Sequence, residues 1–327
     1  MAILKHIALK NANYGNAVRY LLYKHDEQTG KTILDEYGAL QYRDDFILDG
    51  INCNPYTYAS ECMATNKAFG KNQDPNEIKE HHYILSFDPA DLDRGLTKEK
   101  AQDLGMEFAR KYFPGHQILV CTHTDGDNGS GNIHVHIVLN SLRKLTVEHE
   151  EWMERPCDHI AGYKHHLSSS LLTFLKKNVM EMCEREGLNQ VDLLSPAEKK
   201  VTDREYRAQQ HGQKALEERN AEIFQDGYIP KKAKYETDKE RIRIAVDDIS
   251  QFATSFEMFK NELFEKYHIL VFDKRGRYSY LPSNRKQPIS ERQLGISCSR
   301  DDLIRQFEEN QKVPNRKAPP KTKYLYS

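Results

Sequence analysis

The sequence predicts an α+β fold with an antiparallel central sheet and flanking helices, followed by a connector helix and a small α/β module that contains a hairpin. Over the first 190 residues, strand and helix patterns follow the order strand–helix, strand–helix, strand–strand, helix, which is typical of α+β and split-βαβ domains. Residues 196–226 are mostly charged and helix-favouring, with few apolar residues. They separate this region from a C-terminal part that shows its own helix and strand patterns. The expected parts are a main domain over 1–195, a helical connector and linker over 196–237, a small basic module over 238–310 and a flexible tail over 311–327.

Local patterns predict each element of the main domain in turn. Apolar residues alternate in 2–10 and in 82–87, and Asp88-Pro89 stops the second of these strands. Two further β-rich runs, 117–123 and 133–140, are joined by a loop rich in Gly, Asp and Asn. Helices are expected at 16–25, near 58–69, from the capping residue Thr97 to Pro114-Gly115, and at 165–186 before Gly187.

The C-terminal third is basic. Residues 227–327 hold 21 Lys and Arg against 14 Asp and Glu, whereas the rest of the chain holds 27 against 35. The module there shows a helix pattern at 255–266 and a hairpin sequence at 268–282. A basic end on an acidic body indicates contact with a polyanion, and an unevenly charged solvated surface is the alternative.

Composition excludes several classes of protein. The chain has 327 residues, of which 38% are hydrophobic and 30% charged. No run of about 18 apolar residues is present, which excludes a transmembrane helix, and the first residues lack the apolar core of a signal peptide. Six cysteines show no CxxC pair, so we expect a reduced, cytoplasmic protein without a disulfide framework or a cysteine zinc site.

Two histidines interrupt the apolar strand at 133–140. Because strand side chains alternate, His134 and His136 project from one face while the apolar residues beside them are buried on the other. His123 ends the preceding strand, so an antiparallel pair of strands would bring three imidazoles within reach of one cation. Asp125 can orient a ligand histidine through its second nitrogen. Surface histidines on an edge strand are the alternative.

Three neutral imidazoles leave coordination positions open, which is typical of a catalytic metal site. By ligand softness they suit Zn, Fe, Ni or Mn better than Mg, and a hard cation would draw further oxygens from water or a phosphate. No GxxxxGK[ST], GxGxxG or GxSxG motif is present. Tyr14, Tyr20 and Tyr23 lie in or before the first helix, and a tyrosine hydroxyl near such a metal can attack phosphate.

The motifs resemble those of HUH endonucleases, and in particular conjugative relaxases of the single-tyrosine MobA-like type, from plasmids or integrative conjugative elements. HTD at 123–125 followed by IHVHIVLN at 133–140 is similar to the family pattern H-x-D…H-x-H…N. NAVRYLL resembles the segment around the family's nucleophilic tyrosine, and GINC (50–53) and HHYILSFDPAD (81–91) resemble further family signatures. The resemblance covers roughly residues 1–190, and the order of its motifs is its specific part.

The resemblance implies an HUH-type fold and a site- and strand-specific nuclease for single-stranded DNA. His123, His134 and His136 would hold Mg²⁺ or Mn²⁺, and Tyr20 would attack a phosphate at an origin of transfer. A covalent 5′-phosphotyrosine and a free 3′-OH would form, and the reverse reaction would religate the strand. Tyr23, one helical turn from Tyr20, is the alternative nucleophile.

Supporting roles are expected for other residues. His82 would accept a proton or contact a phosphate, or it is simply a satisfied histidine at a strand end. Asn140, on the face of His134 and His136, would contact DNA or support a ligand, and Arg143 would meet a phosphate. The small basic module over 238–310 would bind a DNA hairpin or duplex beside the nick. The alternative is that its basic hairpin turn is simply solvated. Its candidate DNA-binding residues are Lys274, Arg275, Arg277, Tyr278, Arg285 and Lys286.

The expected partners are origin-of-transfer DNA, accessory relaxosome proteins and a type IV secretion coupling protein, without membrane insertion. The expected location is the bacterial cytoplasm, with export to a recipient cell on the covalently attached DNA. Three alternatives remain: a rolling-circle replication initiator or HUH transposase, a non-catalytic DNA-binding module with a structural metal, and an unrelated metallohydrolase.

Overall fold

The computed structural model describes residues 3–10, 13–26, 31–125 and 132–312 and divides the chain into two compact units. The first unit runs to Ser195 and the second begins at Pro196. The finer division of the second unit into connector, module and tail stays a prediction.

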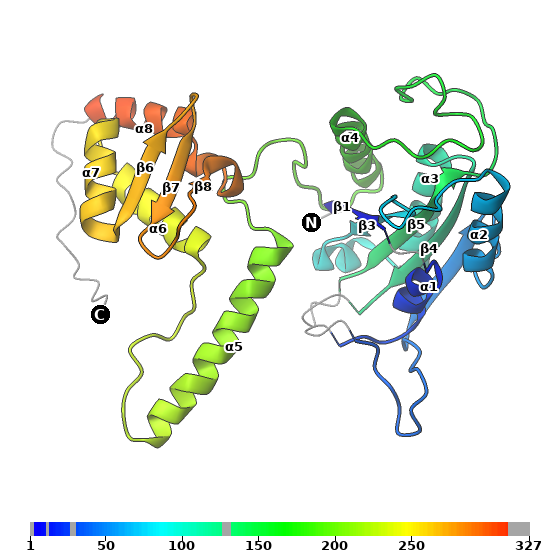
Figure 1. Ribbon diagram of the computed structural model, residues 1–327, viewed down its shortest axis with the longest axis horizontal. Helices are drawn as coiled ribbons and strands as arrows, with labels where there is room; N and C mark the ends of the chain where they lie inside the picture. The colour runs from blue at the N-terminus through cyan, green and yellow to red at the C-terminus, as the bar shows by residue number, and fades with distance from the viewer. Residues whose placement is uncertain (1–2, 11–12, 27–30, 126–131, 313–327) are drawn as a thin grey trace. The chain divides into compact units, whose positions relative to one another are not determined.

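A five-stranded antiparallel sheet forms the first unit, with the strand order β1-β3-β5-β4-β2 (Figure 1). The strands are β1 Ile3–Leu9, β2 Phe46–Ile51, β3 Glu80–Ser86, β4 His116–His123 and β5 His134–Arg143. The predicted mixed α/β fold is confirmed, and so are four of the strands. Strand β2 was not predicted, because it contains Asp49-Gly50 and lies in a stretch rich in turn residues.

Helices cover both faces of this sheet. They are α1 Gly15–Leu22, α2 Tyr58–Ala68, α3 Lys98–Tyr112 and α4 Ser169–Arg185, with a short 3-10 helix at Pro89–Arg94. Helix α3 begins at its predicted cap, where the Thr97 hydroxyl accepts from the backbone N–H of Lys100 at 3.2 Å. Helix α1 ends at Leu22, three residues earlier than expected, and Tyr23 already has extended backbone.

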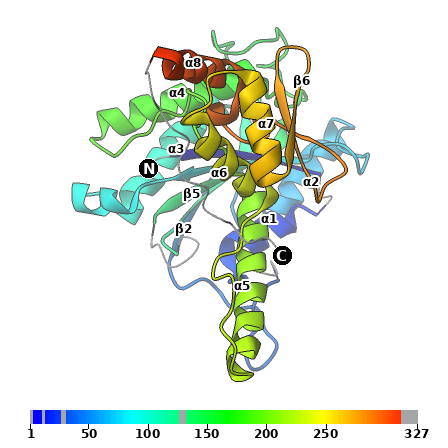
Figure 2. The ribbon, with the colours of Figure 1, turned by 90° about the vertical axis from the view of Figure 1, so that its left-hand side faces the viewer.

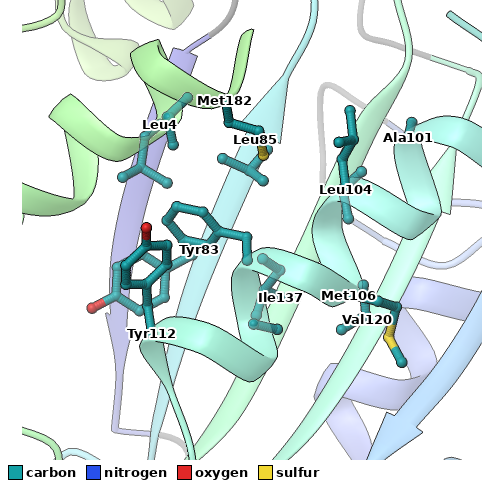
Figure 3. Close-up of a cluster of buried hydrophobic side chains, with 14 of the residues drawn as sticks. Leu4, Tyr83, Leu85, Ala101, Leu104, Met106, Tyr112, Val120, Ile137 and Met182 are labelled. Carbon is teal, nitrogen blue, oxygen red and sulfur yellow. The ribbon is translucent and has the colours of Figure 1, made fainter. Parts of the chain in front are cut away.

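The apolar face of the sheet packs against α3 and α4. Figure 3 shows Tyr83, Leu85 and Ile137 from the strands beside side chains from these two helices. Gly105 lets α3 approach closely, because a Cβ there would lie 2.4 Å from a methyl carbon of Val135. The other face packs against α1 and α2 through a smaller cluster that includes Leu21, Tyr58 and Val138.

Four histidines lie together at one end of the apolar face. A ring nitrogen of His6 lies 2.9 Å from one of His81, and the Tyr83 hydroxyl lies 2.8 Å from His165. The ring of His116 lies 5.8 Å from that of His165. Burial lowers the pKa of His6 to about 4 and that of His81 to about 3, and it holds the pKa of His116 and His165 well below 6.5. These imidazoles are therefore neutral in the folded protein near pH 7.

The second unit has its own core, formed by helices around a three-stranded sheet of order β6-β7-β8. Its elements are α5 Asp203–Gln225, α6 Asp238–Ser250, α7 Phe256–Tyr267, β6 Ile269–Asp273, β7 Tyr278–Pro282, β8 Ile289–Ser290 and α8 Arg300–Lys312, with 3-10 turns at Glu291–Gln293 and Ile296–Cys298. Figure 2 shows α7 beside β6. The predicted helix 255–266 and the hairpin are confirmed. Helices α6 and α8 were missed, because their charged residues obscure the apolar spacing.

Helix α5 is held to this core at its first turn. The buried Arg243 of α6 donates to Glu205 of α5 at 2.6 Å and also to the backbone carbonyl of Leu294 at 2.9 Å. After α5 the chain turns at Gly227, with φ of 82°, and runs back along the helix, where Gln213 bonds the backbone of Ala233 and Tyr235. The connector is therefore a helix with a returning segment packed along it. Among the helices of the described ranges, none has the length and apolar character that a membrane crossing requires.

The four buried histidines predict acid sensitivity. Their folded-state pKa values lie below the unfolded value of about 6.5, so the unfolded chain binds more protons as the pH falls from about 6.5 toward 4. The free energy of unfolding, measured by urea denaturation in EDTA, should therefore fall over this window. His81→Gln should make the pH dependence shallower by up to about one proton. The exposed His211→Gln is the control, and equal slopes in both variants would contradict the prediction.

Candidate active site

Three histidines meet where β4 ends and β5 begins. In the antiparallel register His123 lies opposite His134, and Cys121 lies opposite His136, so all these side chains are on one face. The three ring centroids are 4.7 to 5.3 Å apart. Each residue offers one ligand nitrogen, and these nitrogens lie within 4.8 Å of one another, which is the only such group of metal-ligating side chains within the described ranges. The predicted cluster is thus brought together on a central strand rather than at an edge.

Each imidazole is oriented by a bond at its other nitrogen. His123 Nε2 lies 2.8 Å from the Leu21 carbonyl of α1, and His134 Nδ1 lies 3.3 Å from the Asn132 carbonyl. These distances fix the tautomers that leave His123 Nδ1 and His134 Nε2 for a cation. His123 Nδ1 and His136 Nε2 are buried and have no hydrogen-bond partner among the residues that the structure describes. A cation bound by three imidazoles would satisfy both atoms.

His82 holds the third ligand. Its Nε2 lies 2.8 Å from His136 Nδ1, and both side chains are buried. If His136 binds a metal through Nε2, its Nδ1–H donates to His82 Nε2, and that nitrogen of His82 cannot accept a further proton. This contact suits His82 to the positioning of a ligand, and its expected role as a proton acceptor or phosphate contact stays a prediction.

The imidazoles of His123 and His136 are neutral in the folded protein. Burial lowers the pKa of His123 to about 3 and holds that of His136 well below 6.5, and the positive charge of Arg43 and the neighbouring imidazoles lower both further. Neutral imidazoles are the form that binds metal.

Tyr20 lies beside this cluster. Its ring centroid is 5.6 Å from that of His136 and 5.9 Å from that of His82, both edge-on, and 42% of the residue is exposed. Tyr23 follows the end of α1, and its hydroxyl lies 3.2 Å from that of Tyr42. The two tyrosines therefore do not share a helix face, and Tyr20 is the one whose ring lies against the imidazoles.

Asp125 has a different partner from the one expected. Its carboxylate pairs with the guanidinium of Arg43, and 48% of the Asp125 side chain is exposed. The second nitrogen of His123 bonds the Leu21 carbonyl instead. Sequence reasoning missed Arg43, because it lies outside every recognisable pattern, 82 residues from Asp125.

Two expected DNA contacts in this unit lie inside the protein. Asn140 is fully buried, and its amide bonds Asn66, Gln117 and the backbone of Leu142. Arg143 is buried at the far end of β5, where its guanidinium bonds the Pro114 carbonyl. Nine residues of strand, about 30 Å, separate it from His134. Both expectations are therefore corrected in favour of packing roles.

The hairpin of the second unit presents part of the expected basic surface. Lys274, Arg275 and Arg277 are exposed at its tip, where Arg275 and Gly276 both have positive φ, as a two-residue hairpin turn requires. Arg285 and Lys286 are exposed as well, although Arg285 pairs with Asp238 at 2.9 Å. Tyr278 is only 1% exposed and stacks on Phe256, so it belongs to the core and is not available to a base.

Part of the chain, including the three histidines, matches a known protein family. Residues 39–156 match the family model of the MobA/VirD2-like relaxase nuclease domain. Two curated relatives, both named Protein rlx and both from Staphylococcus aureus, are 26% and 28% identical over 80% and 76% of this chain. The matched regions span 68% and 62% of the lengths of these relatives.

Two solved structures are similar to the chain at lower levels. The relaxase domain of MobM, bound to plasmid pMV158 oriT DNA in an Mn-bound crystal structure, is 15% identical, with a TM-score of 0.39 over 63% of this chain and 97% of that one. The conjugative relaxase TrwC in complex with oriT DNA is 12% identical, with a TM-score of 0.32 over 95% and 98%. Because both TM-scores lie below 0.5, the assignment depends on the sequence matches. Residues 39–156 are therefore similar to the nuclease domain of the MobA/VirD2-like relaxases, in agreement with the motifs of the sequence.

Proposed function

We propose that this chain nicks one strand of DNA at an origin of transfer by tyrosine transesterification and later religates it, which initiates conjugative transfer or mobilisation. One observation carries the proposal: the Tyr20 ring lies against a cluster of three imidazoles within a relaxase nuclease domain. Tyr20 is partly exposed, so its hydroxyl can meet a DNA strand, whereas the imidazoles behind it are largely shielded from solvent.

His123, His134 and His136 are the proposed ligands of a divalent cation, Mg²⁺ or Mn²⁺. The two buried nitrogens without partners among the described residues support this assignment, and so do the neutral imidazoles. Three protein ligands leave positions for phosphate and water oxygens. Such a cation would act as a Lewis acid that polarises the phosphate and offsets its developing charge.

Tyr20 is the proposed nucleophile. Its hydroxyl oxygen would form a bond to phosphorus while the bond from phosphorus to O3′ breaks, leaving a 5′-phosphotyrosine and a 3′-OH. The phenolic proton would pass to solvent, and O3′ would leave protonated. One phosphodiester replaces another, so the reverse reaction rejoins the strand without an external energy source.

Two alternatives concern the identity of the nucleophile and the class of enzyme. Tyr23 remains the alternative nucleophile, but its pairing with Tyr42 favours a structural role. A rolling-circle replication initiator or an HUH transposase would use the same cluster, and the match to a relaxase nuclease domain favours transfer.

We also propose that the exposed hairpin tip of the second unit binds the DNA hairpin or duplex beside the nick. Its three cations at Lys274, Arg275 and Arg277 are suited to phosphates. The proposed partners beyond DNA are accessory relaxosome proteins and a secretion coupling protein. The proposed location is the bacterial cytoplasm, with export on the attached strand.

Covalent capture tests the nucleophile. The substrates are 3′-labelled single-stranded oligonucleotides that together cover the DNA flanking the gene. With Mn²⁺, the protein should form a covalent protein–DNA adduct that is visible on denaturing gels. EDTA and Tyr20→Phe should abolish it, because each removes one component of the reaction, whereas Tyr23→Phe should retain it. Loss in Tyr23→Phe alone would transfer the role to Tyr23. Cleavage without an adduct would favour a metallohydrolase.

Metal affinity tests the role of His82. His82→Ala removes the acceptor that orients His136, so the Kd for Mn²⁺, measured by calorimetry, should rise about 10- to 100-fold. His82→Gln keeps a polar partner and should lose less. The exposed His211→Gln should bind like the wild type. An unchanged Kd in His82→Ala would mean that the hydrogen bond does not position the ligand.

Salt dependence tests the hairpin tip. Replacing Lys274, Arg275 and Arg277 together by Gln should reduce the slope of log Kd against log salt by about 2 to 3, if each cation neutralises one phosphate. Fluorescence anisotropy with a DNA hairpin next to a single strand gives the slope. A matched triple change of the exposed Lys231, Lys232 and Lys234 to Gln is the control. If both variants lose slope equally, the tip has no special role.

A further inference from the structure

Arg43 occupies a position that the proposed reaction has not used. Its backbone N–H donates to the Leu22 carbonyl at 2.9 Å, which ties it to the end of the helix that carries Tyr20. Its side chain is only 12% exposed, and its guanidinium carbon lies 6.0 Å from the centroid of the Tyr20 ring. A cation is therefore fixed next to the proposed nucleophile.

The guanidinium is only partly satisfied. Nη1 pairs with the Asp125 carboxylate, whereas Nε is buried and has no hydrogen-bond partner in the part of the chain that the structure describes. Nε and Nη2 form one edge of the guanidinium, which matches two oxygens of a phosphate. With Nη1 held by Asp125, this second edge is the one suited to another anion.

Arg43 also lies close to the proposed metal ligands. The centroid of the Tyr20 ring is 6.0 Å from the Arg43 guanidinium carbon and 5.6 Å from the centroid of the His136 ring. A cation beside a proposed dication is unfavourable unless an anion lies between or beside them. Arg43 and a bound dication would together carry three positive charges, and Asp125 supplies one negative charge. A bound phosphate would therefore offset part of the remaining two positive charges.

We propose that Arg43 binds the scissile phosphate through its Nε and Nη2 edge, and that Asp125 positions it for this contact. This inference rests on the proposed function, because it assigns the group that contacts the phosphate beside the metal. The phosphorane-like transition state carries more negative charge on its non-bridging oxygens than the ground state does. A fixed guanidinium stabilises that charge more than it stabilises the bound substrate.

A purely structural role for the Arg43–Asp125 pair gives different expectations. The pair joins the segment before β2 to the end of β4, so its loss could simply loosen the site. In that case metal affinity and thermal stability would fall together with activity. A phosphate contact instead depends on the charge of one DNA phosphate and leaves metal binding intact.

The first experiment measures the rate of adduct formation with the oligonucleotide that the wild type cleaves. Arg43→Met should slow this rate about 10²- to 10³-fold, and Arg43→Lys should retain part of it, because Lys keeps the charge but not the fork. Asp125→Asn should lower the rate of adduct formation in the otherwise wild-type protein, but it should lower the rate little further in the Arg43→Met variant. Arg110→Met, on an exposed position of α3, is the matched control and should react like the wild type.

The second experiment measures binding without chemistry, in EDTA and in a Tyr20→Phe background. A methylphosphonate at the mapped nick position removes one charge, and it should weaken binding about tenfold when Arg43 is present and not when Met replaces it. Equal weakening in both proteins would overturn the phosphate contact. So would an unaltered adduct rate in Arg43→Met, or a joint loss of Mn²⁺ affinity and thermal stability in that variant. Absence of any adduct with wild-type protein would instead overturn the proposed function itself.

Discussion

The pairing of β4 with β5 is the constraint on which the candidate site depends. With His123 opposite His134 and Cys121 opposite His136, three imidazoles share one face and apolar residues share the other. A slip of one residue would send the imidazoles into the apolar core and Val135 toward Tyr20. The apolar core under α3 therefore fixes the register, and the register in turn fixes the geometry of the three proposed metal ligands.

The short helix α1 connects Tyr20, the proposed nucleophile, to that geometry by its backbone. The Leu21 carbonyl orients His123, and the Leu22 carbonyl accepts from the backbone of Arg43. Tyr20 precedes these two residues, so its position, one ligand and one cation all depend on the same helical turn. The same arrangement brings the neutral imidazoles of His123 and His136 close to the paired arginine, as the proposed binding of a cation and a phosphate requires.

Sequence patterns predicted much of this arrangement but not all of it. Alternation and capping identified four strands of the main sheet, helix α3 and the histidine cluster, because each depends on residues near one another in the chain. The contacts of His82 with His136 and of Arg43 with Asp125 join distant segments, and no local spacing encodes them. Asn140 and Tyr278 carried polar groups suited to DNA, but tertiary packing buries both, which one strand pattern alone cannot show.

The strand order also determines how the chain reaches the site. β1 and β2 lie at opposite edges of the sheet, so the segment between them, which includes α1, must cross an entire face. The segment that carries Tyr20 is therefore anchored at both edges of the sheet, by β1 and by β2. Detachment of either edge strand would release one end of this segment, while the three inner strands that carry the imidazoles stay paired. The pairing of the outermost strands is thus coupled to the alignment of Tyr20, even though neither strand supplies a proposed metal ligand.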